Sequence, residues 1–278
     1  MYSDMKQPRN LVLVLILLSL FGLVFSTIFP QLANHWSNDP NYSHGFLVPV
    51  ISAYLIWQKR SELSSLQIKP ANSGLILILF GLFVLFAGVA AQEFYMKRSS
   101  SIFLLAGIVL FLLGWQWFKA LWLSVGFLFF MIPLPYIIYD AIAFPLKLFV
   151  AKFSVLSLKL LGVVVLREGN IIMFPNTVLE VADACSGLRS LMSLLALGVA
   201  LAVLTQKRKL AMVLLVALTV PIAVLTNMFR VIVTGYLAQY YGAAAAEGFF
   251  HEFAGMGVFL LAMVLLFVSS GVLRKILN

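Results

Sequence analysis

Long apolar stretches recur along the whole chain and are separated by short polar segments. A helix needs about 20 mostly apolar residues to cross a hydrocarbon core of about 30 Å. We predict eight crossings, at about residues 11–29, 46–57, 73–91, 101–116, 119–135, 187–205, 210–229 and 253–273. Charged residues make up 10% of the chain, far below the roughly 25% of soluble domains, which excludes a soluble protein. The sequence predicts an all-α polytopic membrane protein.

The distribution of basic residues predicts which side of the membrane each loop faces. Short cytoplasmic loops of membrane proteins carry an excess of Lys and Arg. If the N-terminus lies inside, eight crossings return the C-terminus to the cytoplasm and place the whole net charge of +9 there. The basic run at 206–209 and the terminal pair Arg274 and Lys275 then face the cytoplasm. We therefore predict an N-in/C-in topology.

Residues 137–166 are apolar but contain Lys147, Lys152 and Lys159. If this segment crossed the membrane, the basic clusters downstream of it would be exported. We expect instead an interfacial helix on the outer face, with its lysines reaching toward water. No linker rich in proline or serine and no obvious repeat divides the chain. Residues 1–278 are therefore expected to form a single integral membrane domain.

Three chemically distinctive side chains fall at the outer interface in this topology. Cys185 precedes the sixth crossing, Arg230 follows the seventh and His251 precedes the eighth. Because Cys185 is the one cysteine, no internal disulfide can form. The thiolate is the nucleophilic form of cysteine, and its pKa falls from about 8.5 at a helix N-terminus or beside a cation. Both conditions are expected here, because the helix starts at Gly187 and Arg189 follows one turn after the cysteine.

Each of these residues also has a plainer interpretation, which the residues alone leave open. A free cysteine is often a small apolar residue at a helix end. An arginine at a helix end can anchor the helix at the interface, and a histidine there can be satisfied by water. Glu180 and Asp183 precede the cysteine, and either orient His251 or neutralise Arg189.

Two histidine-containing segments bear on metal and substrate binding. HEFAG at 251–255 begins like the zinc motif H-E-x-x-H, but position 255 is Gly, so a zinc protease is rejected. Gly255 is better explained by close packing of a neighbouring helix. We expect no metal ion and no cofactor. His44 lies with His35 in the outer loop 30–45, where it either helps to gate or bind substrate or is a water-exposed loop histidine.

Several motifs together resemble those of the exosortases, polytopic membrane cysteine transpeptidases that process C-terminal sorting signals in Gram-negative bacteria. In the order of that family, they are YSHGFLVP at 42–49, PLP at 133–135, ADACSGLRSL at 182–191, NMFR at 227–230 and HEFAG at 251–255. The core A-C-S-G-L-R-S is the most specific of these. The downstream Asn-x-x-Arg and His-x-x-x-Gly strengthen the resemblance, which extends over most of the chain.

The resemblance implies a nucleophilic Cys185, a transition-state stabiliser in Arg230 and an acid/base in His251. The residues in supporting positions are Arg189, Asn227, Glu180, Asp183 and His44. The implied substrates are secreted proteins with a tripartite tail of the PEP-CTERM type: a Pro-Glu-Pro-type motif, a transmembrane helix and a basic cluster. The implied active site faces the periplasm from the bacterial inner membrane. Any periplasmic exopolysaccharide partner would be a separate protein, and no nucleic acid is expected.

Two other classes of function are alternatives to this one. A transporter would carry ionisable residues near the midplane of its helices, and the predicted spans hold almost none. A non-catalytic membrane subunit of an exopolysaccharide export system would use Cys185, Arg230 and His251 for packing and anchoring. Replacing Cys185 by Ser separates the two hypotheses, because it leaves a scaffold working and disables a thiol enzyme.

Overall fold

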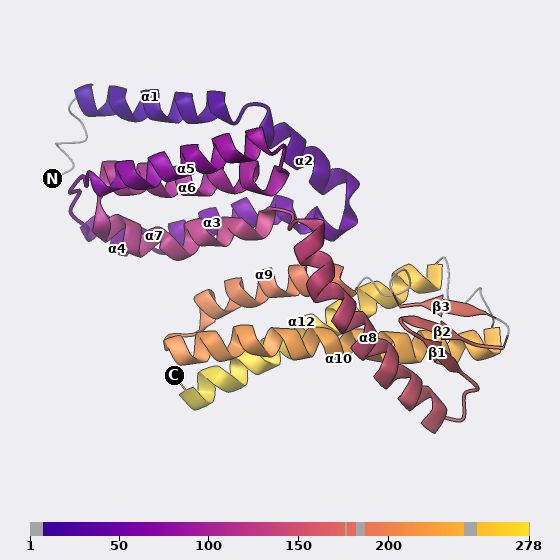
Figure 1. The fold of residues 1–278 in the computed structure, drawn as a ribbon. Coiled ribbons are helices and arrows are strands. Elements are labelled where there is room, and N and C mark those ends of the chain that lie inside the picture. The colour runs from indigo at the N-terminus through magenta and orange to yellow at the C-terminus, as the bar shows by residue number, and fades with distance from the viewer. Residues whose placement is uncertain (1–7, 176, 182–186, 242–248, 278) are drawn as a thin grey trace. The chain divides into compact units, whose positions relative to one another are not determined.

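The computed structural model describes residues 8–175, 177–181, 187–241 and 249–277 (Figure 1). The chain divides into two compact units, Met1–Pro135 and Tyr136–Asn278, each with its own internal packing. The first contains α1 (Pro8–Val24), α2 (Ile28–Asn38), the 3-10 helix η1 (Pro40–Phe46), α3 (Leu47–Gln58), α4 (Arg60–Ser65), α5 (Ser73–Ala90), α6 (Phe94–Leu113), α7 (Trp115–Phe127) and the 3-10 helix η2 (Leu128–Met131). The second contains α8 (Tyr136–Leu160), β1 (Leu166–Glu168), β2 (Ile171–Met173), β3 (Val178–Glu180), α9 (Gly187–Thr205), α10 (Lys209–Tyr241) and α12 (Phe249–Leu277).

Among the described residues, five helices are long and apolar enough to cross a membrane. They are α5, α6, α8, and the parts Lys209–Gln239 of α10 and Gly255–Leu277 of α12. A sixth span results if the bent pair Val14–Val24 and Ile28–Asn38, which meet at 54°, is counted as one. The all-α polytopic membrane fold is thus confirmed, but the predicted count of eight is not. The helices α3 and α7 have only 12 and 13 residues, and the apolar stretch Leu191–Thr205 within α9 is also short for a span.

The segment predicted as an interfacial helix, 137–166, differs in two ways from that prediction. Its first part belongs to α8, a continuous helix of 25 residues with Pro145 inside it, whose length and composition suffice for a crossing. Its last part leaves the helical conformation and enters β1. An interfacial position is therefore not confirmed, because the three lysines are spread widely enough for an 18-residue apolar window to remain. The N-in/C-in topology and the single domain stay predictions.

Glycines spaced seven residues apart form the contact between α5 and α6, which lie side by side in the first unit (Figure 1). Gly74, Gly81 and Gly88 are the buried residues of α5. A repeat of seven residues is close to two helical turns, so the three glycines share one face. A Cβ at Gly81 would lie 2.6 Å from Leu104 Cδ1, and one at Gly88 would lie 2.7 Å from the backbone nitrogen of Lys97. Small residues let membrane helices approach this closely.

Buried side chains also fasten the polar segment before α3 to the region that follows α7. The indole nitrogen of Trp36 donates a hydrogen bond of 2.8 Å to the carbonyl oxygen of Met131. The backbone N–H of Leu134 donates to the hydroxyl of Tyr42 over 3.3 Å. These contacts join parts of the chain that are more than 90 residues apart in sequence. They hold η1, which carries His44, in a defined place within the first unit.

A small antiparallel sheet in the second unit leads toward Cys185. Its order is β1-β2-β3, and Glu168 pairs with Ile171 across a turn formed by Gly169 and Asn170. Gly169 has φ +60°, the left-handed conformation that tight hairpin turns demand and glycine adopts readily. The all-α prediction did not include this sheet, because each strand has only three residues.

The core of the second unit consists of several clusters of buried apolar residues. Buried apolar residues of the sheet pack with α8 and with one side of α10: Val150, Ala151, Val155, Leu158, Val163, Val165, Ile172, Phe174, Leu179, Val181 and Val231. A second cluster joins α9, α10 and α12 through Leu191, Leu194, Ala223 and Ala262. Through these clusters α10 packs against the sheet and against α8, α9 and α12. This position decides the surroundings of Arg230.

Candidate active site

Arg230 lies inside α10, where the guanidinium is almost fully removed from solvent, with 6% of the residue exposed. The sequence analysis ended this crossing at residue 229, but α10 continues to Tyr241. Arg230 is thus within the stretch Lys209–Gln239, which is long and apolar enough to span a membrane. A charged side chain inside such a helix is costly, so ionisable residues there commonly mark functional sites. The burial of Arg230 does not match a simple interfacial anchor.

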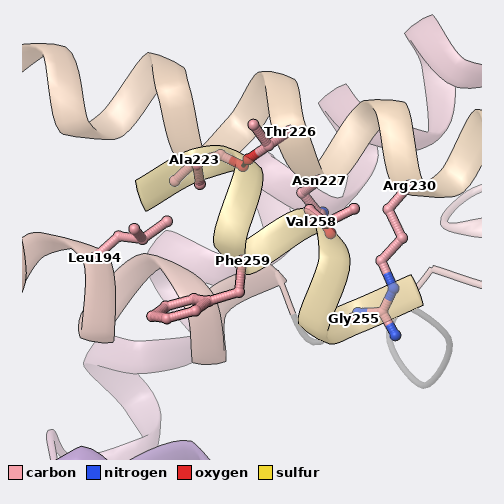
Figure 2. A pocket seen from close by; sticks show the side chains of 9 residues that line it. Leu194, Ala223, Thr226, Asn227, Arg230, Gly255, Val258 and Phe259 are labelled. Atoms are coloured by element: carbon pink, nitrogen blue, oxygen red, sulfur yellow. Dashed lines mark hydrogen bonds between the residues drawn. The ribbon is translucent and has the colours of Figure 1, made fainter. Parts of the chain in front are cut away.

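The guanidinium of Arg230 rests on Gly255 of α12 (Figure 2). An ideal Cβ at position 255 would be 3.2 Å from Nη2, 3.4 Å from Cζ and 3.5 Å from Nη1 of Arg230. The expectation that Gly255 permits close packing is therefore correct, but the group packed there is a side chain rather than a helix backbone. Arg230 reaches from α10 onto α12 through the space that the missing side chain leaves.

A narrow crevice, too tight to admit a water molecule, runs between α9, α10 and α12 beside this contact (Figure 2). Thr226, Asn227 and Arg230 contribute its polar atoms, together with the backbone at Gly255. The apolar remainder comes from Leu194, Ala223, Val258, Phe259 and Ala262. Thr226 donates its hydroxyl hydrogen bond to the carbonyl of Ile222, 2.8 Å away, so its polar group is satisfied within α10. Asn227, predicted as a supporting residue, lies one turn before Arg230 and is 9% exposed.

The other two predicted catalytic residues can be placed only by the chain around them. His251 lies on α12, one turn before Gly255, so the backbone positions of 251 and 255 share a face of that helix. Cys185 lies outside the described residues, as does Asp183. The helix that follows the cysteine begins at Gly187, the residue predicted to start it, and Arg189 is in its first turn. Cys185 stands two residues before this helix in the sequence, and its role stays a prediction.

Glu180 closes the sheet immediately before the segment that carries Cys185. Its Oε1 accepts a hydrogen bond of 3.1 Å from the side-chain amide of Asn170 in the hairpin turn. The backbone carbonyl of Asn170 in turn accepts a hydrogen bond of 3.0 Å from the N–H of Val181. Asn170 was missed by the sequence analysis, although the Gly-Asn pair inside an apolar run is a recognisable hairpin signal. It fixes the point where the chain enters the cysteine segment.

His44 belongs to the first unit, where it is half-buried in η1 rather than fully exposed to water. Burial lowers the pKa of His44 below its ordinary value of 6.5, and the nearby backbone groups of Phe130 and Asn41 oppose part of that effect. A neutral imidazole is therefore favoured at neutral pH. The role of His44 in substrate binding stays a prediction.

The described residues contain no group of three or more His, Cys, Asp and Glu side chains arranged to hold a metal ion. What the described part of the site offers is a fixed cation beside a hydrogen-bonding amide, in surroundings from which water is largely excluded. A guanidinium in such a place can stabilise a developing negative charge, because its donors are fixed and its charge is permanent.

The protein-family comparison matches the chain over residues 36–268 to transmembrane exosortase (Exosortase_EpsH). The match runs from α2 into α12, and so includes the helices that carry Arg230, Gly255 and His251. The comparisons with curated proteins and with solved structures gave no match. The several long apolar helices make this a multi-pass membrane protein, as the family's description requires. Because the match spans most of the chain, the protein belongs to the transmembrane exosortase family.

Proposed function

We propose that this protein is a membrane cysteine transpeptidase or peptidase that cleaves C-terminal sorting signals of secreted proteins. Cys185 acts as the nucleophile, Arg230 stabilises the oxyanion and His251 transfers protons. The observation that carries the proposal is the buried guanidinium of Arg230, which rests on α12 one turn from the position of His251. Two of the three assigned groups thus belong to elements in direct contact, inside the region that matches the family.

In the first step, the thiolate of Cys185 attacks the scissile carbonyl carbon, and the carbonyl oxygen becomes negatively charged. Arg230 stabilises this oxygen through two or more N–H donors, which are effective because the site is buried. The C–N bond then breaks, and His251 donates a proton to the leaving amine. The products are a thioester on Cys185 and the freed C-terminal tail.

In the second step, an incoming nucleophile attacks the thioester carbon, and His251 accepts its proton. The C–S bond breaks and the thiolate of Cys185 is restored. With water as the nucleophile, the net reaction is hydrolysis. With an amine, the acyl group is transferred and the reaction is transpeptidation. Both routes require the same three groups and no cofactor.

The site is proposed to face the periplasm from the bacterial inner membrane, the side that the charge distribution predicts. A substrate tail with a Pro-Glu-Pro-type motif ahead of a transmembrane helix would bring its scissile bond to that interface. The helix of the tail would lie in the bilayer, and the basic cluster behind it would face the cytoplasm. The proposed partners are such secreted proteins, with any exopolysaccharide partner a separate periplasmic protein.

The test is co-expression with a secreted reporter that carries a Pro-Glu-Pro-type tail, followed by gel and mass analysis of the reporter. We expect shortening with the wild-type protein and none with Cys185→Ala or Cys185→Ser. A reporter with a scrambled motif but an intact tail helix is the control for general proteolysis. Membrane fractions of each variant establish equal amounts of enzyme.

Equal shortening by wild type and Cys185→Ala would refute the thiol mechanism. If cells that depend on this protein for polysaccharide export keep that function with Cys185→Ser, the non-catalytic subunit is the better description. Mass analysis of the new C-terminus distinguishes water from an amine acceptor, because only the second adds mass to the cleaved reporter.

A further inference from the structure

Gly255 is the point at which α12 receives the side chain of Arg230. We propose that Gly255 is a positioning residue: its lack of a side chain holds the Arg230 guanidinium on the face of α12 that carries position 251. This inference rests on the proposed function, in which Arg230 and His251 act on the same reacting group. It adds a fourth residue that does not touch the substrate but decides where Arg230 lies.

The first argument is the identity of the atoms around Gly255. The three heavy atoms nearest to an added Cβ all belong to the Arg230 guanidinium, at 3.2, 3.4 and 3.5 Å. Glycines that serve helix packing meet different neighbours. A Cβ on Gly74 would lie 2.6 Å from the Cα of Phe111, which is a backbone atom of the adjacent helix. Gly255 therefore makes room for one functional side chain and not for a helix backbone.

The second argument is that any larger residue at position 255 would push the Arg230 guanidinium away from α12. A Cβ at 3.2 Å is tighter than ordinary van der Waals contact, so the guanidinium must shift by a few tenths of an ångström for alanine. The two additional methyl groups of valine demand a larger displacement. Because Arg230 is 6% exposed and enclosed by α10 and α12, the guanidinium has little room to move except away from α12. Any side chain at 255 thus separates it from the helix of His251.

The third argument is the sensitivity of catalysis to such a shift. A misplacement of about 1 Å in a group that acts on the transition state can lower the rate about 100-fold. Removing a donor to the oxyanion altogether costs about 10²–10³ in rate. The position of the guanidinium therefore matters almost as much as its presence, and Gly255 controls that position.

Gly257 provides a matched control on the same helix. Nothing lies within 4 Å of an added Cβ at position 257, two residues from Gly255. Replacement of either glycine by alanine changes helix propensity equally. With the full-length protein and the sorting-signal reporter, we expect Gly255→Ala to lower kcat about 10-fold and Gly255→Val about 100-fold, at a nearly unchanged KM. The variants Gly257→Ala and Gly257→Val should stay within about two-fold of wild type.

A double-mutant cycle with Arg230→Ala separates positioning from a general structural effect. If Gly255 acts through Arg230, Gly255→Ala causes no further loss of activity once the guanidinium is absent. The same cycle, measured as the thermal unfolding temperature in detergent, should show that Gly255→Ala is destabilising only while Arg230 is present. This second measurement does not depend on turnover.

Full activity of Gly255→Val would overturn the inference, and so would equal losses in the Arg230 and Arg230→Ala backgrounds. Failure of the proposed function would give a different result. The wild-type protein would not process the reporter, or Cys185→Ala would still process it. In that case the thermal cycle alone decides whether Gly255 positions Arg230. Should Gly255→Val not fold, Gly255→Ala and the thermal cycle carry the same test.

Discussion

The side-chain amide of Asn170 donates a hydrogen bond of 3.1 Å to the carboxylate of Glu180, and so ties the hairpin turn to the end of β3. Val181, the next residue, donates its N–H to the backbone carbonyl of Asn170 over 3.0 Å. Two contacts from one residue therefore fix the chain four residues before Cys185.

Asn170→Ala should lower both stability and processing, because the end of β3 loses its side-chain restraint. The loss of one such hydrogen bond to a charged group corresponds to about 1.5–3 kcal/mol of unfolding free energy when buried, and this site is only partly buried, so about 1 kcal/mol is expected. Thermal unfolding in detergent and the reporter assay measure the two effects. Glu168→Ala, an exposed change on the same hairpin, is the control, and equal effects of both variants would contradict the prediction.

Arg230→Ala should lose processing by about 10²–10³ while the protein still inserts into the membrane. Arg230→Lys should recover little of this loss, because it keeps the charge but not the planar set of donors. Initial rates of reporter cleavage at equal enzyme amounts provide the measurement. Substantial turnover by Arg230→Ala would remove this residue from the proposed mechanism.

Gly74→Ala should destabilise the first unit more than Gly81→Ala. At Gly74 an added Cβ meets backbone atoms of Phe111, which cannot move without shifting α6. At Gly81 the nearest atom is Cδ1 at the end of the Leu104 side chain, and the nearest backbone atom, the nitrogen of Leu104, is farther away at 3.0 Å. Overpacking of a tight contact typically costs 1–3 kcal/mol. Unfolding temperatures of the two variants measure which one is less stable. Gly126→Ala is the control and should leave stability unchanged, because nothing lies within 4 Å of an added Cβ at position 126. The reverse order for Gly74 and Gly81 would contradict this account.

Gln206→Ala should loosen the contact between α9 and α12. The amide nitrogen of Gln206 donates to the carbonyl oxygen of Ser270 over 3.0 Å and to its hydroxyl over 2.9 Å, and Gln206 is 3% exposed. Polar contacts between membrane helices contribute about 0.6 kcal/mol on average and up to about 1.7 kcal/mol. We expect a loss in this range by reversible unfolding in mixed micelles. The exposed Gln58→Ala is the control, and identical stabilities would disprove the contribution.

The stability of the first unit should fall as the pH drops below about 6.5. Burial lowers the pKa of His44 in the folded state below 6.5, so the unfolded state binds more protons between these two pKa values. Stability therefore rises with pH across that window and is constant above it. Unfolding temperatures between pH 5 and 8 should show a smaller slope for His44→Gln than for wild type. If the slope of unfolding temperature against pH were the same in His44→Gln and wild type, the pH dependence of stability would come from other titrating groups.

Much of the membrane architecture could be predicted from the sequence, because an apolar stretch is recognised from residues that are neighbours in the chain. The apolar stretches predicted at 73–91 and 187–205 correspond closely to α5 and α9. Ends were less certain where an apolar run contains a polar residue: the crossing predicted to stop at 229 continues as α10 to Tyr241. A charged residue such as Arg230 lowers the local hydropathy and so ended the predicted crossing. The helix itself continues, because the charged side chain is buried against neighbouring helices.

Short strands escaped detection for a related reason. Each strand of the sheet has three residues, too few for an alternating pattern to stand out from a generally apolar chain. The sequence therefore predicted a helical segment up to residue 166, and pairing with β2 overrode it. The predicted roles of Cys185, Arg189, Asp183 and His251 stay predictions.

The sequence by itself determined that the chain lies in a membrane, where several of its apolar helices are, and that the motifs around Cys185, Arg230 and His251 resemble those of one family. These properties depend on residue type and spacing, which are local. Only the tertiary structure decided that Arg230 is buried and rests on Gly255, that Asn170 holds Glu180, and that glycines of α5 face α6. Such contacts join residues distant in sequence, and depend on which faces of the helices and strands meet when the chain packs.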